Sequence, residues 1–338
     1  MSQPIPERGA VSPEEFRDVL VACRPLVLRG QVRQWPAVRA GCEGAAAFRD
    51  YLLGFDRGLS MEAFFGPPAI RGKYYYGGDF SAFNFERKQM RFAAALEAVV
   101  ENLKHDGAPS VYAGSVPVED YLPGFTVENA MPLLSGGQPR IWVGHASNVS
   151  SHYDAMENIA CVTAGRRRFT LYPPGLIGKM YVGPIDRTMA GQPVSLAASG
   201  APVPGHYPDF EPYRDHALVA ELEPGDALFL PKLWWHQVEG LAPFNVLVNY
   251  WWDAFRIGPD APYTAMLLAM ITIAERPPEE RAAWRAWFEH YVFRGEGHPL
   301  RHLKPEEHGL LGPLKSNAQP DNYGRLRAYI MHLLRGGA

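Results

Sequence analysis

The feature that most constrains the fold is a series of short strand-like runs between residues 109 and 255. Each run is rich in aliphatic, aromatic or β-branched residues, and turn residues separate it from the next. The runs span residues 110–113, 140–143, 158–163, 167–172, 226–230 and 245–252. Short strands at this spacing predict a β-sandwich or barrel.

Residues 175–216 interrupt the series of strands. This segment is rich in Gly, Pro, Ser and Tyr. We interpret it as a long insertion, which on an all-β scaffold is often a binding loop.

The N-terminal segment has mixed patterns. Ser12, Pro13 and Glu15 form a capping-box sequence with proline at the first helical position, which predicts a helix to about Ala22. The other predicted elements are a short apolar strand at 25–30, helices at 45–53 and 90–103, and strands with loops in the aromatic segment 74–85.

The C-terminal segment has helical patterns at residues 263–276, 279–293 and 322–335, each with a large apolar face. Such faces must pack on the barrel or on a second copy of the chain, and we expect a homodimer through these helices. The predicted organisation is an N-terminal α/β segment that packs on the barrel, a β core with the insertion 175–216, and a C-terminal helical region. Their ranges are 1–108, 109–258 and 259–338.

Composition excludes some partners. The net charge is −3, and the only tight basic cluster is Arg166 to Arg168, which argues against a nucleic-acid partner. The three cysteines have no metal-type spacing and the first residues have no apolar core, so we expect a cytoplasmic protein. The longest apolar stretch, residues 265–274, is far shorter than the ~20 residues of a membrane span.

His152-Tyr153-Asp154 is the first element with metal-binding potential. On a strand, a spacing of two residues places His152 and Asp154 on one face and Tyr153 on the other. Taken alone, the pattern is more often a hydrogen-bonded surface pair than a metal site.

The second element surrounds His236. Pro224-Gly225-Asp226 predicts a tight turn into an apolar strand that ends at Pro231, and His236 follows beside two tryptophans. A single histidine in such a setting is more often a core residue bonded to a carbonyl. Two histidines with one carboxylate, however, form the facial triad of non-heme Fe(II) oxygenases, whereas zinc more often takes three histidines or cysteines. We therefore predict that His152, Asp154 and His236 bind Fe(II).

These residues carry a family resemblance over about residues 10 to 255. The chain resembles the JmjC/cupin-like (cupin 8) Fe(II)/2-oxoglutarate oxygenases, and within them the asparaginyl hydroxylase type called factor inhibiting hypoxia-inducible factor. The matching motifs occur in order: Asn148 to Asp154, Asn158, Gly165 to Phe169, Leu171 to Pro174, Pro224 to Asp226, Pro231, Trp234 to His236 and Asn249 to Trp251. The resemblance implies a double-stranded β-helix, also called a jelly-roll. With the helical patterns at both ends, the predicted fold is mainly β, with flanking N-terminal helices and a C-terminal helical bundle.

The resemblance also implies residues for the cosubstrate. Its closest members use a lysine for the distal carboxylate of 2-oxoglutarate, where this chain has Arg167 with Arg166 and Arg168 as alternatives. Strand alternation favours Arg167, because Phe169 and Leu171 share its inward face. Arginine offers a carboxylate a two-pronged hydrogen bond where lysine offers a point charge.

Three more residues match cosubstrate positions of the family, namely Tyr112, Asn158 and Asn249. The asparagines could instead satisfy backbone groups, and Tyr112 could be a core aromatic residue. Trp251 and Trp252, like the run Tyr74 to Tyr76, could line a substrate groove or pack in the core.

The resemblance implies a dioxygenase that consumes 2-oxoglutarate and O₂ and hydroxylates a substrate, expected to be a protein or peptide side chain. N-methyl demethylation is the less favoured reaction, and small molecules or RNA stay open as substrates. One alternative is a non-oxygenase metal-binding cupin, such as an isomerase or a sugar-binding module, which would not need Arg167, Tyr112 and Asn249. Another is a catalytically inactive interaction scaffold.

Overall fold

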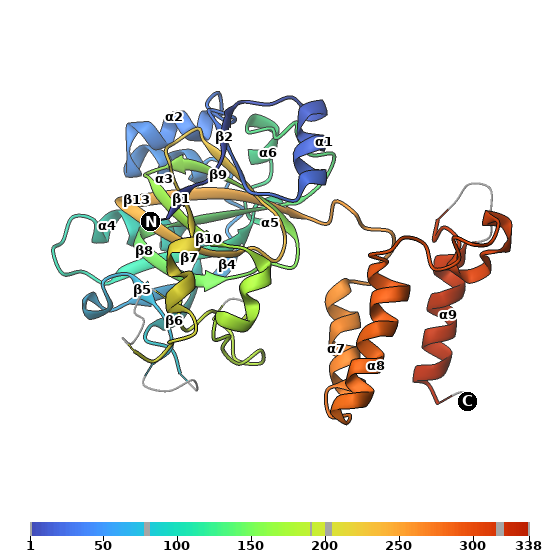
Figure 1. The fold of residues 1–338 in the computed structure, drawn as a ribbon. Coiled ribbons are helices and arrows are strands. Elements are labelled where there is room, and N and C mark those ends of the chain that lie inside the picture. Colours follow the sequence, from blue (N-terminus) through green and yellow to red (C-terminus); the bar gives the residue numbers. More distant parts are fainter. Residues whose placement is uncertain (1, 78–81, 190, 200–204, 316–320, 337–338) are drawn as a thin grey trace. The chain divides into compact units, whose positions relative to one another are not determined.

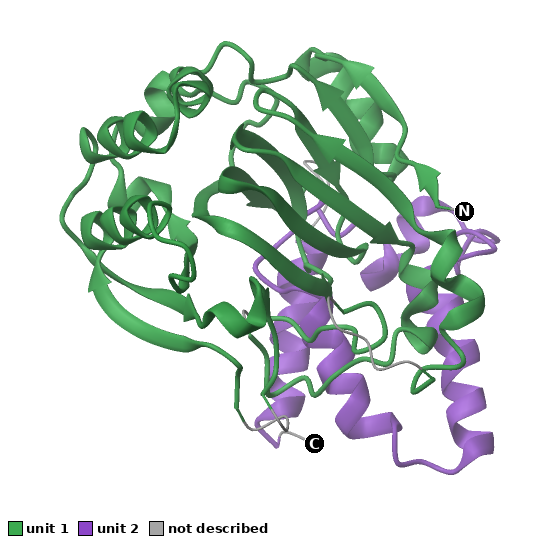
Figure 2. Ribbon diagram, turned by 90° about the vertical axis from the view of Figure 1, so that its left-hand side faces the viewer, with its two compact units in different colours: residues 1–254 green, residues 255–338 purple. Residues whose placement is uncertain are grey.

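The computed structural model describes residues 2–77, 82–189, 191–199, 205–315 and 321–336 (Figure 1). The chain divides into two compact units, Met1–Ala254 and Phe255–Ala338 (Figure 2).

Unit 1 combines thirteen described strands with helices that lie mostly in its N-terminal half. The strands are β1 Gln3–Pro4, β2 Glu7–Gly9, β3 Leu26–Arg29, β4 Ser60–Gly66, β5 Lys73–Tyr74, β6 Glu86–Arg91, β7 Ser110–Pro117, β8 Gln138–His152, β9 Glu157–Ala164, β10 Arg167–Tyr172, β11 Leu218–Leu222, β12 Ala227–Leu230 and β13 Trp235–Trp252. The α-helices are α1 Pro13–Ala22, α2 Pro36–Glu43, α3 Ala45–Leu53, α4 Phe92–Asn102, α5 Val118–Tyr121 and α6 Phe125–Glu128.

Two long strands connect the layers of the β core. β13 pairs with β8 along most of its length, and the register shifts between His236 and Val238 and again between Gly240 and Phe244. The first half of β13 pairs with β10, whereas its second half pairs with β9. One layer therefore has the order β2-β3-β12-β9-β13-β8-β7-β4-β6. The other layer starts from the first half of β13 and goes on through β10, β11 and β1. This mainly-β arrangement confirms the predicted jelly-roll.

Two apolar cores hold unit 1 together. One lies between the layers and includes Val162, Phe169 and Leu228, all buried. The other includes Phe16 of α1 and Phe92 of α4, which are also buried. The first cluster fills the space between the two layers of strands, and the second packs the N-terminal helices on the outer face of the sheet.

The local predictions at the N-terminus are confirmed where capping signals were present. Ser12 Oγ accepts the Glu15 amide at 3.2 Å and Glu15 Oε2 accepts the Ser12 amide at 2.8 Å, which completes the capping box of α1. The helix predicted from residue 90 begins at Phe92 instead, because residues up to Arg91 pair with β4. The sequence patterns did not reveal α2, β4 and β11.

The insertion between β10 and β11 folds against the end of β8. It contains the 3₁₀ segments Pro174–Lys179 and Glu211–His216 and a small apolar cluster that includes Met180 and Phe210. The Ser195 amide donates to the Ser151 carbonyl at 2.7 Å, which ties the insertion to β8. Residues 190 and 200–204 of this predicted loop lie outside the described residues, as do residues 78–81 of the segment 74–85.

Unit 2 consists of the helices α7 Pro262–Ile273, α8 Pro278–Phe288 and α9 Asn322–Leu334, with a π-helical turn at Glu289–Phe293. Among its described residues no Ala, Val, Ile, Leu, Met, Phe, Trp or Tyr side chain is buried. Ile271, Trp287 and Phe293 are 82%, 59% and 68% exposed. Across the described parts of the chain, no helix has the length and apolarity to span a membrane.

Candidate metal centre

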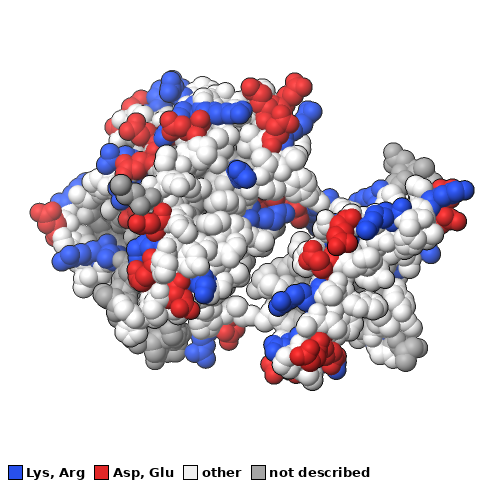
Figure 3. Space-filling model, viewed as in Figure 1, with Lys and Arg blue, Asp and Glu red and all other residues white. Residues whose placement is uncertain are grey.

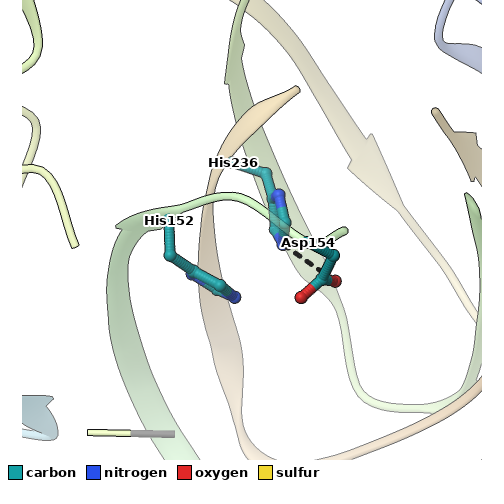
Figure 4. A group of neighbouring side chains, drawn as sticks. All are labelled: His152, Asp154 and His236. Atoms are coloured by element: carbon teal, nitrogen blue, oxygen red, sulfur yellow. Dashed lines mark ion pairs between the residues drawn. The ribbon is translucent and has the colours of Figure 1, made fainter. Parts of the chain in front are cut away.

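The structure brings His152, Asp154 and His236 together at the end of the barrel strands (Figure 4). His152 is the last residue of β8, and its direct partner across the ladder is His236 of β13. The two imidazole centroids lie 4.2 Å apart, and His236 Nε2 lies 3.7 Å from Asp154 Oδ2. One ligand atom from each side chain lies within 4.8 Å of the others, so the three can hold one metal ion.

Asp154 reaches the site by a different route from the predicted one. The prediction placed His152 and Asp154 on one strand face, but β8 ends at His152 and Asp154 lies in the following loop. The Leu233 amide donates to the Asp154 carbonyl at 2.8 Å, which holds this loop against the residues before β13. Tyr153 points elsewhere, with its ring 5.0 Å from that of Trp235.

Backbone carbonyls orient both imidazoles. His152 Nδ1 lies 3.0 Å from the Ser150 carbonyl, and His236 Nδ1 lies 2.9 Å from the Trp234 carbonyl. A carbonyl oxygen only accepts, so each Nδ1 is the hydrogen-bond donor and each Nε2 is the atom that a metal ion would bind. Burial, together with the neighbouring His152, lowers the pKa of His236 to about 4, so this imidazole is neutral at neutral pH. Two imidazoles and one carboxylate form a donor set that fits Fe(II).

A single cavity contains all seven of the predicted site residues. It encloses about 940 Å³ of space not filled by protein atoms, including its open mouth. Phe64, Tyr74, Phe85, Trp142 and Trp251 contribute an aromatic wall. The predicted site residues on its lining are Tyr112, His152, Asp154, Asn158, Arg167, His236 and Asn249.

Arg167 is a buried cation in this cavity. It is 2% exposed, and no carboxylate among the described residues lies within ion-pair distance of it. The Tyr112 hydroxyl interacts electrostatically with its guanidinium group, whereas the Arg167 Nε is buried without a hydrogen-bond partner among the described residues. Burial lowers the pKa of Arg167, and Tyr112 opposes this shift. An unpaired buried charge costs several kcal/mol, which an anionic ligand would offset.

The side chains of the two neighbouring arginines lie outside the cavity, against Glu221. Arg168 donates to Glu221 at 2.7 Å, and Arg166 lies 3.7 Å from the same carboxylate on the outer side of β10. Only Arg167 of the three lines the cavity. Strand alternation therefore predicted the correct arginine to face inward.

The two predicted asparagines form part of a hydrogen-bond chain that ends on Asp154. Trp142 Nε1 donates to Asn249 Oδ1 at 2.6 Å, and Asn249 Nδ2 donates to Asn158 Oδ1 at 3.2 Å. Asn158 Nδ2 then donates to Asp154 Oδ2 at 3.5 Å. Each side-chain amide has two N–H groups, so one N–H of each asparagine is left over for a ligand in the cavity.

Comparison with known proteins places this core in a family. The sequence profile of the cupin-like domain matches residues 12–256. The chain belongs to the cupin-like family.

Its cupin-like core is similar to proteins with JmjC names. Jumonji C domain-containing protein 5 of Drosophila melanogaster is 25% identical over 255 residues, which are 74% of this chain and 60% of that protein. The human bifunctional peptidase and (3S)-lysyl hydroxylase JMJD7 is 24% identical over 264 residues, covering 70% and 80% of the two chains. Lysine-specific demethylase JMJ31 of Arabidopsis thaliana is 33% identical over 116 residues, 33% of this chain and 20% of that protein.

This cupin-like chain thus spans one fifth of the plant demethylase and three fifths of the fly protein. The expected likeness to the asparaginyl hydroxylase type in particular does not follow from these relatives, whose names refer to a demethylase and a lysyl hydroxylase.

Several cavity residues of the cupin-like core were not among the predicted site residues. For Trp251 the sequence left a substrate groove and the core open, although it lies two residues from Asn249 on β13 and both side chains line the cavity. Trp142 lies an even number of residues before His152, but two register shifts between them make alternation a weak guide over that distance. Met189 and Gln192 come from the insertion, whose path had no sequence pattern.

Proposed function

We propose that this protein is an Fe(II)- and 2-oxoglutarate-dependent dioxygenase that hydroxylates a side chain of a protein or peptide. His152, Asp154 and His236 would hold the iron. Arg167 and Tyr112 would bind the distal carboxylate of 2-oxoglutarate, and Asn158 and Asn249 would contact its other end.

The buried Arg167 carries this proposal. A metal triad alone suits any metal-binding cupin, but a dicarboxylate cosubstrate also needs a cation elsewhere in the same cavity. Arg167 and the triad line one cavity, and Arg167 has no carboxylate partner among the described residues. The aromatic wall would exclude water from this charge, which strengthens its attraction for the carboxylate.

Bound Fe(II) would supply O₂ activation coupled to the decarboxylation of 2-oxoglutarate to succinate and CO₂, with one oxygen atom entering a C–H bond of the substrate. The protein's own residues would do the positioning. The carbonyls of Ser150 and Trp234 hold the imidazoles, and the aromatic wall shields the reacting groups.

A protein substrate is supported by the relatives, one of which is named a lysyl hydroxylase and another a lysine-specific demethylase. Charge argues against a nucleic-acid substrate, because basic and acidic side chains are interspersed on the face drawn in Figure 3. Hydroxylation is preferred to demethylation. We place the protein in the cytoplasm, where its three free cysteines would stay reduced.

Succinate formation tests the proposed reaction. Iron-loaded protein is incubated aerobically with 2-oxoglutarate and with pools of peptides, amino acids or nucleic acids. We expect slow succinate release without substrate, a clear increase with peptides, and neither in Arg167→Leu. Folded, iron-loaded protein that releases no succinate with any pool would favour a non-oxygenase cupin or an inactive scaffold.

We also propose that a second copy of the chain covers the apolar faces of unit 2. Apart from Pro299, this unit has no buried apolar side chain among its described residues, so its own helices do not bury their apolar faces against one another. A symmetric pair of such units would bury these faces without requiring a different partner.

A further inference from the structure

The two oxygens of Asp154 have different surroundings. Oδ2 accepts the indole N–H of Trp251 at 3.1 Å and the weaker donor of Asn158 at 3.5 Å. Among the described residues no donor bonds Oδ1. Oδ2 also faces His236 Nε2, but at 3.7 Å the two make no hydrogen bond.

Trp251 is held in place from several sides. Its backbone lies in β13 between Gln138 of β8 and Asn158 of β9. Its ring meets that of Trp142 edge-on at 6.0 Å between centroids, and the guanidinium of Arg140 lies 5.5 Å from its ring centroid. Arg140 is itself fixed by a 2.8 Å hydrogen bond to the Ser115 carbonyl. These contacts fix the direction of the indole N–H of Trp251, which donates to the Asp154 carboxylate.

A hydrogen bond from a fixed donor to a carboxylate restricts the rotation of that carboxylate about its last bond. It also engages one of the two oxygens, so that a metal ion would gain less from binding both. We infer that Trp251 is a positioning residue, whose indole N–H holds Asp154 Oδ2 so that the carboxylate binds the metal through Oδ1 alone. This inference rests on the proposed metal centre. A carboxylate that supplies one oxygen leaves more metal positions open for cosubstrate and O₂.

The alternative is that Trp251 only satisfies its own buried N–H and packs against Trp142. Trp251→Phe separates the two, because phenylalanine keeps an aromatic ring and removes the donor. Trp252→Phe is the matched control, since Trp252 packs on Phe16 and Phe229 and does not line the cavity.

The probe is Mn(II), whose free fraction is read by electron paramagnetic resonance and whose bound waters are read by water-proton relaxation. We expect Trp251→Phe to bind Mn(II) about 10- to 100-fold more weakly. It should also show fewer exchangeable waters on the bound ion, because the released carboxylate takes a second position. Trp252→Phe should match the wild type in both readouts.

Folded Trp251→Phe with wild-type affinity and wild-type water count would overturn the inference and leave the proposed function standing. Wild-type protein that fails to bind one Mn(II) per chain would instead overturn the proposed metal centre. If Trp251→Phe does not fold, a measurement on the wild-type protein still tests the inference. With ¹⁵N-labelled tryptophan, Zn(II) is expected to move an indole N–H resonance, and a spectrum in which none moves contradicts the inference.

Discussion

Arg167 is a strongly constrained side chain of the cavity, because its charge is buried and the described residues supply no counter-ion. Such a residue lowers stability and is retained for binding when a ligand supplies the missing charge. In this respect it differs from Arg168, whose charge is paired with Glu221 at the surface.

This contrast predicts opposite effects on stability and binding. Arg167→Leu should raise or preserve the thermal midpoint of the metal-loaded protein, because it removes a desolvated charge. It should also abolish the rise in midpoint that 2-oxoglutarate causes in the wild type, since removing one partner of a buried charge pair costs about 2–5 kcal/mol. Differential scanning fluorimetry with and without 2-oxoglutarate measures both.

Arg168→Leu is the control and should keep the response to 2-oxoglutarate. The assignment of Arg167 is wrong if Arg167→Leu and the wild type are stabilised equally by the cosubstrate. Arg167→Lys should retain part of the response, because lysine supplies the charge without the planar fork.

At the scale of elements, strand alternation predicted cavity residues only where a strand runs without interruption. On β10 it placed Arg167 correctly, and on the second half of β13 the cavity residues Leu247, Asn249 and Trp251 follow the same period of two. On β8 the period fails at Val149, which lies an odd number of residues from both Trp142 and His152, and β8 has an extra residue opposite the step from His236 to Val238. Such shifts depend on the pairing of distant strands and have no local sequence signal.

The loops too were predictable only where local residues determine their conformation. The Pro224-Gly225-Asp226 turn was predictable, and the structure has Gly225 at φ 101° with the Asp226 amide donating to the Glu223 carbonyl at 3.0 Å. The loop position of Asp154 was not predictable, because its hydrogen bond comes from Leu233, nearly eighty residues later in the chain. Residues held by local bonding were therefore predicted well, and residues held by distant partners were not.

The packing of α2 on the sheet gives a prediction for stability. A Cβ at Gly41 would overlap the backbone oxygen of Thr163 on β9, so only glycine allows this approach. Gly41→Ala should lower the free energy of unfolding by about 1–3 kcal/mol. Urea denaturation measures this, with Gly175→Ala as the control because a Cβ there meets nothing within 4 Å. Equal stability of the two variants would show that α2 does not pack closely on β9.

At the scale of the whole molecule, the sequence predicted the jelly-roll and the helical C-terminus, whereas the partner of that C-terminus stays a prediction. The apolar faces were visible as helical periodicity, and the helices of unit 2 do not bury them against one another. Neither the sequence nor one chain's own contacts specify what covers such a face.

The proposed homodimer can be tested in solution. Light scattering after size exclusion should give about twice the chain mass of 37.6 kDa for the wild type. Ile271→Asp should shift the mass toward that of one chain, because it places a charge on an apolar face. The control Arg276→Ala changes the same helical region without adding a charge to that face. A wild-type mass of one chain at micromolar concentration would contradict the dimer.

The central claim is that one cavity binds Fe(II) and 2-oxoglutarate together. Anaerobic mixing of the protein with Fe(II) and 2-oxoglutarate tests it most directly, because only a keto acid bound to the metal gives the weak visible charge-transfer band. We predict the band for the wild type and for the control His105→Ala, whose imidazole is exposed on the surface, and its loss in His152→Ala. Folded, iron-loaded wild-type protein without the band would contradict the claim.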